Sequence, residues 1–174
     1  MENQNYATKT MLSYGTMLGI ASIILSVLNY SFGNIYNPHW IFATLGPLLF
    51  VGFIVYGIKA FKLSNEGFLK LGQAIKIGLG IALIAGIIAS IYQFVFMNYI
   101  EPDYMTKVAE VQEQILYEKF PDMDEALIEK QLEITQKFSS PGILLAFSLA
   151  GSLIMGLIIS LIAGLFMKKE DNQY

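Results

Sequence analysis

Serine hydroxyls are the groups in this sequence that most directly invite a chemical role. Within the charge-free stretch 138–167, small residues recur at every fourth position: Ser148, Ser152, Gly156, Ser160 and Gly164. Residues spaced in this way lie on one face of a helix. If the helix crosses a membrane, the hydroxyls line a polar path, to which Asn29, Gln93 and Asn98 near other span ends would add. Alternatively, the small side chains form a seam for a neighbouring helix.

We do not expect these serines to act in catalysis. A serine nucleophile needs a nearby base, and the single histidine, His39, lies between Pro38 and Trp40 in a turn-forming cluster. We interpret His39 as a residue of the membrane interface, with a pH sensor or a lone metal ligand as the alternative. The chain has no Cys and no Arg, which leaves no thiol redox site and no arginine clamp for phosphate. We therefore expect no enzyme activity and no cofactor.

Three acidic residues, Asp122, Asp124 and Glu125, raise the question of a cation site. An EF-hand loop needs a glycine and a distal glutamate in a fixed frame, which this segment lacks. Acidic residues are also favoured at the start of a helix, where they interact with its dipole. We therefore interpret the three as helix-starting residues and expect no metal site.

The elements that must position these residues are membrane spans. The stretches 10–58, 77–100 and 138–167 contain no Asp, Glu, Lys or Arg, and about 20 apolar residues suffice to cross the hydrocarbon core. The first stretch is long enough for two helices, and the turn-forming residues 33–39 divide it. The sequence predicts an all-α integral membrane protein with one domain over 1–174 and four transmembrane helices at about 11–32, 40–58, 74–99 and 141–167.

A second series of small residues lies in the third predicted span, at Gly78, Ala82, Gly86 and Ser90. Helices in lipid associate through close backbone approach, because lipid tails are as apolar as the side chains that they would replace. We expect a seam between the fourth and third spans, or between the fourth span and its symmetry mate in a homo-oligomer.

The lysines predict the orientation of the chain in the membrane. Lys9, Lys168 and Lys169 flank the predicted spans near the termini, and four more follow the second span at Lys59, Lys62, Lys70 and Lys76. Basic residues are retained on the cytoplasmic side. We therefore expect both termini in the cytoplasm of a bacterial inner membrane, with the inverted orientation as the alternative. Aromatic residues mark the opposite boundary, among them Tyr30, Tyr36, Tyr99 and Tyr104.

The acidic segment 101–138 lies on the predicted outer side, and residues 101–137 carry a net charge of −6. Pro121 divides the segment into two expected helices, 103–120 and 122–138, that form an amphipathic hairpin. In the first helix the apolar stripe is Tyr104, Val108, Val111 and Ile115. In the second it is Met123, Leu127, Ile134 and Phe138, with Ile128 and Leu132 directed at a second surface. We expect the stripes to pack together or to lie on the membrane.

Three parts of the sequence resemble the domain-of-unknown-function 4199 family, small membrane proteins found mainly in Bacteroidota. They are GFLKLGQAIKIG at 67–78, IYQFVF at 91–96 and YIEPDY at 99–104. The start of the first span and the helical outer segment fit as well. The resemblance implies four spans and an inner-membrane location. It implies no activity, substrate or site.

The sequence leaves three hypotheses for function. The first is a non-enzymatic interaction or accessory protein, embedded in the lipid bilayer, that meets a protein partner through its acidic outer segment. The second is a small oligomeric channel or carrier with a serine-lined path along the fourth span. The third is a lipid-binding or envelope-stress component that uses the lysine-rich loop after the second span. No basic patch is present to support nucleic-acid binding.

Overall fold

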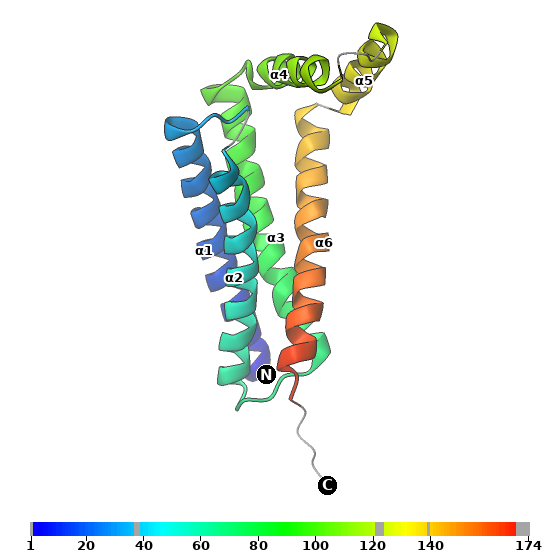
Figure 1. The fold of residues 1–174 in the computed structure, drawn as a ribbon. Coiled ribbons are helices and arrows are strands. Elements are labelled where there is room, and N and C mark those ends of the chain that lie inside the picture. The colour runs from blue at the N-terminus through cyan, green and yellow to red at the C-terminus, as the bar shows by residue number, and fades with distance from the viewer. Residues whose placement is uncertain (1, 37–38, 121–123, 139, 170–174) are drawn as a thin grey trace.

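The computed structural model describes residues 2–36, 39–120, 124–138 and 140–169. Within these residues the chain is all-helical, and four long helices run side by side while two shorter ones lie at one end (Figure 1). The elements are α1 Glu2–Phe32, α2 Trp40–Ser64, α3 Leu71–Val95, the π-helix η1 Phe96–Ile100, α4 Tyr104–Lys119, α5 Glu125–Phe138 and α6 Pro141–Met167. The predicted fold class is confirmed.

All four predicted spans are helices long and apolar enough to cross a membrane, at 5–32, 40–64, 71–100 and 141–167. The fourth span has the predicted bounds. The first three are longer than predicted, because the backbone hydrogen bonds of a helix continue past the last apolar residue into the polar residues beyond it. A turn follows α2, where Glu66 and Gly67 adopt positive φ angles of 54° and 82°.

The central helix of the bundle is α3, which packs extensively against α1 on one side and against α6 on the other. Helix α2 contacts all three. The core is formed by apolar residues that are almost completely buried, among them Leu18, Ile54, Ile58, Ile77 and Ile81. Many other large apolar side chains, such as Ile24, Leu48 and Phe166, face outward. Large apolar side chains on the outer surface, in addition to an apolar core, are typical of helices surrounded by lipid.

The start of α1 and the end of α6 lie at the same end of the bundle, here called the terminal end (Figure 1). At this end the α2–α3 loop holds the C-terminus of α6. Leu69 and Lys169 form an antiparallel β-bridge with N–O distances of 2.8 and 3.0 Å. The Lys62 ammonium donates a hydrogen bond of 2.8 Å to the Met167 carbonyl, one of the groups that a helix end leaves unpaired.

The opposite end, here called the distal end, carries α4 and α5. Figure 1 shows α4 lying across the ends of the spans and α5 rising from its far end. The expected packing of the α5 stripe against α4 is not observed among the described residues, whereas a stripe that lies on the membrane stays a prediction. Ile128 is 1% exposed and Leu132 is half-buried, whereas Leu127 and Ile134 are 59% and 49% exposed. Met123 and the Phe138 side chain lie outside the described part.

The side of α5 that meets α4 is instead the one that carries Leu132, which lines a pocket together with Met105 and Val108 of α4. Ile128 lies one helical turn before Leu132 on the same side of α5. The apolar stripe of α4 behaves as predicted in part: Val108, Val111 and Ile115 are half-buried.

Candidate functional site

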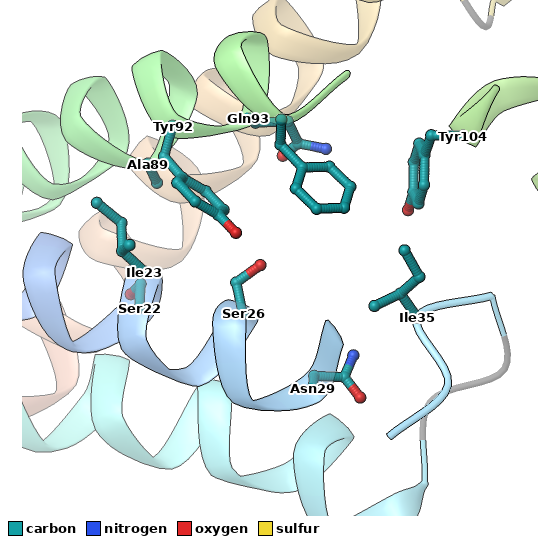
Figure 2. A pocket seen from close by; sticks show the side chains of 10 residues that line it. Ser22, Ile23, Ser26, Asn29, Ile35, Ala89, Tyr92, Gln93 and Tyr104 are labelled. Carbon is teal, nitrogen blue, oxygen red and sulfur yellow. The ribbon is translucent and has the colours of Figure 1, made fainter. Parts of the chain in front are cut away.

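A polar cavity of about 250 Å³ lies between α1 and α3 near the distal end (Figure 2). Helix α1 contributes side chains that lie about one turn apart, and α3 faces them. The start of α4 and the α1–α2 loop close the distal side, through Tyr104 and Ile35. The polar groups of the wall come from Ser22, Ser26, Asn29, Tyr92, Gln93 and Tyr104.

On its α1 side, the cavity is lined by the Asn29 amide and by the hydroxyls of Ser22 and Ser26, which lie on one face of the helix. The Ser22 hydroxyl donates a hydrogen bond of 2.9 Å to the Leu18 carbonyl. The Oδ1 atom of Asn29 is buried and has no hydrogen-bond partner among the described residues. It lies against Gly33, where an added Cβ would come within 2.4 Å of it. Figure 2 shows the amide nitrogen of Asn29 on the cavity side.

The α3 side of the cavity ends in the π-helix η1. The Glu101 N–H donates a hydrogen bond of 2.8 Å to the Phe96 carbonyl, five residues back. A π-helical turn inserts one extra residue into the helix, and such turns are frequent at functional sites. Here it accompanies the burial of Phe96 and Met97, which are 7% and 6% exposed. Phe96 thereby reaches the cavity wall.

Glu101 joins four parts of the chain at the mouth of the cavity. Its carboxylate accepts a hydrogen bond of 3.1 Å from the Tyr30 hydroxyl of α1 and forms an ion pair with Lys107 of α4. The Lys107 ammonium also lies 5.8 Å from the centre of the Tyr36 ring, in the α1–α2 loop. The hydrogen bond with Lys107 lowers the pKa of Glu101, and the same bond raises the pKa of Lys107. Both groups are therefore charged at neutral pH and neutralise each other.

Aromatic rings fill the space below this ion pair. The Phe96 ring meets Tyr30 and Tyr104 edge-to-face, with centroid distances of 5.2 and 5.7 Å. Tyr36 lies 5.8 Å from Tyr104. Burial raises the pKa of the Tyr104 hydroxyl further above its ordinary value of 10.0. The sequence indicated these tyrosines as boundary residues but gave no sign that they meet one another.

The two predicted series of small residues face each other across α3 and α6. A Cβ on Gly78 would lie 2.3 Å from the Ser160 Cβ, and a Cβ on Gly156 would lie 2.5 Å from the Ala82 Cβ. At Gly86 the obstacle is the Ser152 hydroxyl at 2.7 Å, and at Gly164 it is the Ala74 Cβ at 2.8 Å. The series on α6 therefore lies against α3 of its own chain.

The serine hydroxyls of α6 are directed back to their own helix. Ser152 and Ser160 donate hydrogen bonds of 2.8 and 3.0 Å to the carbonyls of Leu149 and Leu157, and Ser160 is fully buried. Ser148 is exposed on the distal half of α6. On α3, the Ser90 hydroxyl is buried without a hydrogen-bond partner among the described residues. This geometry favours close packing over a continuous line of hydroxyls that water could follow.

The acidic residues near the start of α5 are only partly described. The Asp124 carboxylate accepts a hydrogen bond of 3.0 Å from the Ala126 N–H, as a helix-starting residue does. Asp122 and the Glu125 side chain lie outside the described part. Among the described residues, no group of three or more His, Cys, Asp or Glu side chains is arranged to hold a metal ion.

Residues 13–169 match the family model described as "Protein of unknown function (DUF4199)". The chain belongs to this family. The match runs from α1 to the β-bridge at Lys169, so it includes the four candidate spans, the polar cavity and the two distal helices. The resemblance seen in the sequence is thereby confirmed. No curated protein and no solved structure matches the chain.

Proposed function

We propose that this protein is a non-enzymatic membrane component that presents α5 to a protein partner. The observation that carries the proposal is the orientation of α5. Ile128 is buried, whereas Leu127 and Ile134 are exposed on a helix that otherwise carries mostly polar residues, with three Glu and two Lys. Figure 1 shows α5 directed away from the ends of the spans. Apolar side chains in this position are available to another protein.

Charge indicates what kind of partner fits. Residues 101–137 carry a net charge of −6, so a surface with basic residues around an apolar groove is complementary. A second copy of the segment would bring the same negative charge, and anionic lipid headgroups would also repel it. We therefore propose that the binding partner of α5 is a different protein, and not a second copy of this chain or the bilayer surface.

The orientation of the protein is part of the same proposal. The terminal end carries Lys9, Lys168 and Lys169 together with the four lysines around the α2–α3 connection, and we place it in the cytoplasm. The distal end with α4 and α5 then faces the periplasm of a bacterial inner membrane. The spans act as an anchor, as the close packing of α3 on α6 supports. The alternative of a serine-lined channel gains no support from hydroxyls that bond to their own helix.

Site-specific photocrosslinking in living cells tests the proposal. We would place a photoreactive residue at Leu127 or Ile134, with controls at the buried Ile128 and at Ile162, which is exposed on the span α6. We expect one protein to be crosslinked from both exposed α5 positions and from neither control. Its crosslinked peptides should map to a surface with Lys or Arg. Replacing the exposed Glu129 by Lys should reduce the yield about tenfold, by loss of charge complementarity. Crosslinks that form only to a second copy or only to lipid would contradict the proposal. A crosslink yield that Glu129→Lys leaves unchanged would also contradict it.

A further inference from the structure

We infer that the polar cavity between α1 and α3 binds a neutral group rich in hydroxyls, such as a sugar ring or a glycerol unit. This inference does not depend on what α5 contacts. It depends on three properties of the cavity: its lack of net charge, its surplus of hydrogen-bonding groups and its aromatic side.

Among the described residues, the wall of the cavity holds no Asp, Glu, Lys or His side chain. Its polar side chains are hydroxyls and amides, and the ions nearest to its mouth, Glu101 and Lys107, are paired with each other. A charged group that entered would lose its hydration and find no free counter-charge, which costs several kcal/mol or more. The cavity therefore selects against phosphates, carboxylates and ammonium groups.

Hydrogen-bonding capacity is in surplus on both sides of the cavity. Figure 2 shows the hydroxyls of Ser26 and Tyr92 pointing into the space between α1 and α3. Among the described residues, neither these hydroxyls nor the Gln93 amide form a side-chain hydrogen bond with another protein group. All three side chains are half-buried, so their polar groups are free to bond to water or to a ligand. A ligand that both donates and accepts, as a polyol does, would satisfy hydroxyls and amides alike.

Size and shape restrict the ligand further. The cavity volume of about 250 Å³ lies just below the range of about 300–1,000 Å³ typical of ligand pockets, so it admits one small ring and not an oligomer. The Tyr92, Phe96 and Tyr104 rings give the wall an apolar side. The C–H bonds on one face of a sugar ring carry partial positive charge and are attracted to the negative face of an aromatic ring.

The hydroxyl-rich group could come from two sources, a soluble polyol or the headgroup of a neutral lipid. Ser22 marks the deep end of the cavity and lies ten residues before Phe32, about 15 Å along the axis of α1. Each headgroup layer is only about 5–7 Å thick, so the cavity reaches from the distal surface past the headgroups and into the hydrocarbon region. The experiment distinguishes the two sources.

The test uses the full chain purified in a detergent without a sugar headgroup and reconstituted into phosphatidylcholine nanodiscs. The probes are glucose in solution, monoglucosyl diacylglycerol in the bilayer and phosphatidic acid as an anionic comparison. Binding is measured as a rise in the thermal unfolding midpoint and, for lipids, by native mass spectrometry. Gln93→Leu removes an amide from the cavity wall. If the Gln93→Leu variant does not fold, Ser26→Val, which removes a hydroxyl from the wall, replaces it in the test. Asn98→Leu is the matched control, because Asn98 is an exposed amide that does not line the cavity.

If only the glucosyl lipid raises the unfolding midpoint, the cavity is a site for lipid headgroups. If free glucose raises the midpoint, the cavity is a site for soluble polyols. In either case Gln93→Leu should weaken the apparent affinity about tenfold, the upper end of the loss expected for one hydrogen bond, while Asn98→Leu should leave it unchanged. The inference is overturned if neither glucose probe raises the midpoint, because the cavity then holds only water. It is also overturned if phosphatidic acid acts equally well, or if Asn98→Leu reduces affinity as much as Gln93→Leu.

Discussion

Gly78 and Ser160 approach so closely that a Cβ on Gly78 would lie only 2.3 Å from the Ser160 Cβ. This contact lies at the terminal half of the α3–α6 interface, where the fully buried Ser160 hydroxyl bonds to its own helix. The two backbones meet here because neither helix presents a large side chain. In lipid, close approach of this kind is a main source of helix association.

Replacing Gly78 by Val should therefore force α3 and α6 apart. Overpacking of a closely packed site costs about 1–3 kcal/mol, and we expect a clear fall in the thermal unfolding midpoint of the reconstituted protein. Gly151→Val is the matched control, since Gly151 is a glycine on α6 with open space around it. An equal effect of both substitutions would show that the cost comes from the glycine backbone and not from the interface.

The hydrogen bond from Lys62 to the Met167 carbonyl should hold the end of α6 against the end of α2. Removing the ammonium with Lys62→Met should cost about 1 kcal/mol, as expected for a charged donor at a helix C-terminus. Amide hydrogen exchange at Leu69 and Lys169, which form the neighbouring β-bridge, should then become several-fold faster. Lys59→Met removes an exposed lysine of the same helix and should leave both exchange rates unchanged.

The Glu101 carboxylate should make the stability of the distal end depend on pH. Its pKa in the folded protein is lowered from an ordinary value of 4.5, so its contribution is present above that pH and is lost as the pH falls through the lowered pKa. The partner Lys107 has a raised pKa, so its contribution is present below 10.5 and is lost as the pH rises beyond that value.

The acid limb of this dependence can be measured with Glu101→Gln. We expect a lower unfolding midpoint at neutral pH and a smaller fall on acidification than in the unmodified protein. The decrease at neutral pH should be smaller than that caused by Gly78→Val, because the ion pair is reached by water. Glu113→Gln changes an exposed carboxylate of α4 and should leave the pH profile as it was. A profile unaltered by Glu101→Gln would argue against the Tyr30–Glu101–Lys107 link.

Because the chain has no cysteine, single cysteines report orientation directly. A membrane-impermeant thiol reagent applied to intact spheroplasts should label Glu118→Cys at the distal end and not Lys59→Cys at the terminal end. The reverse pattern would invert the proposed topology. In the same series Ser160→Cys should remain unlabelled even after the membrane is permeabilised, because position 160 is buried between helices. Rapid labelling there would indicate an aqueous path and favour a channel.

The orientation of α5 shows where reasoning from local pattern reaches its limit. Leu127 and Ile134 share the strongest apolar stripe of that helix, yet they are exposed, and Ile128 is buried. A periodic pattern predicts that an amphipathic helix exists and which faces differ. It does not say which face meets the neighbouring helix, because that depends on where the preceding and following elements fix its two ends.

The cavity shows the same limit at longer range. Asn29 and Gln93 are recognisable in the sequence as polar residues near span ends, but they are 64 positions apart in the chain. Only the packing of α1 on α3 brings them to one cavity, and only the π-helical turn at Phe96–Ile100 carries Glu101 to Tyr30. The hydropathy of the sequence does not predict which helix packs against α1, and it does not predict where an extra residue is inserted into a helix.

The sequence by itself determined which segments lie in the lipid and which lie in water. Charged residues are too costly in hydrocarbon, so charge-free stretches of sufficient length specify four spans, and small residues at every fourth position specify where backbones approach. The tertiary structure decided which spans are neighbours, which face of α5 is exposed and which distant polar groups share a cavity. These depend on the relative placement of helices, which is set by the sum of many weak packing contacts and not by any single segment.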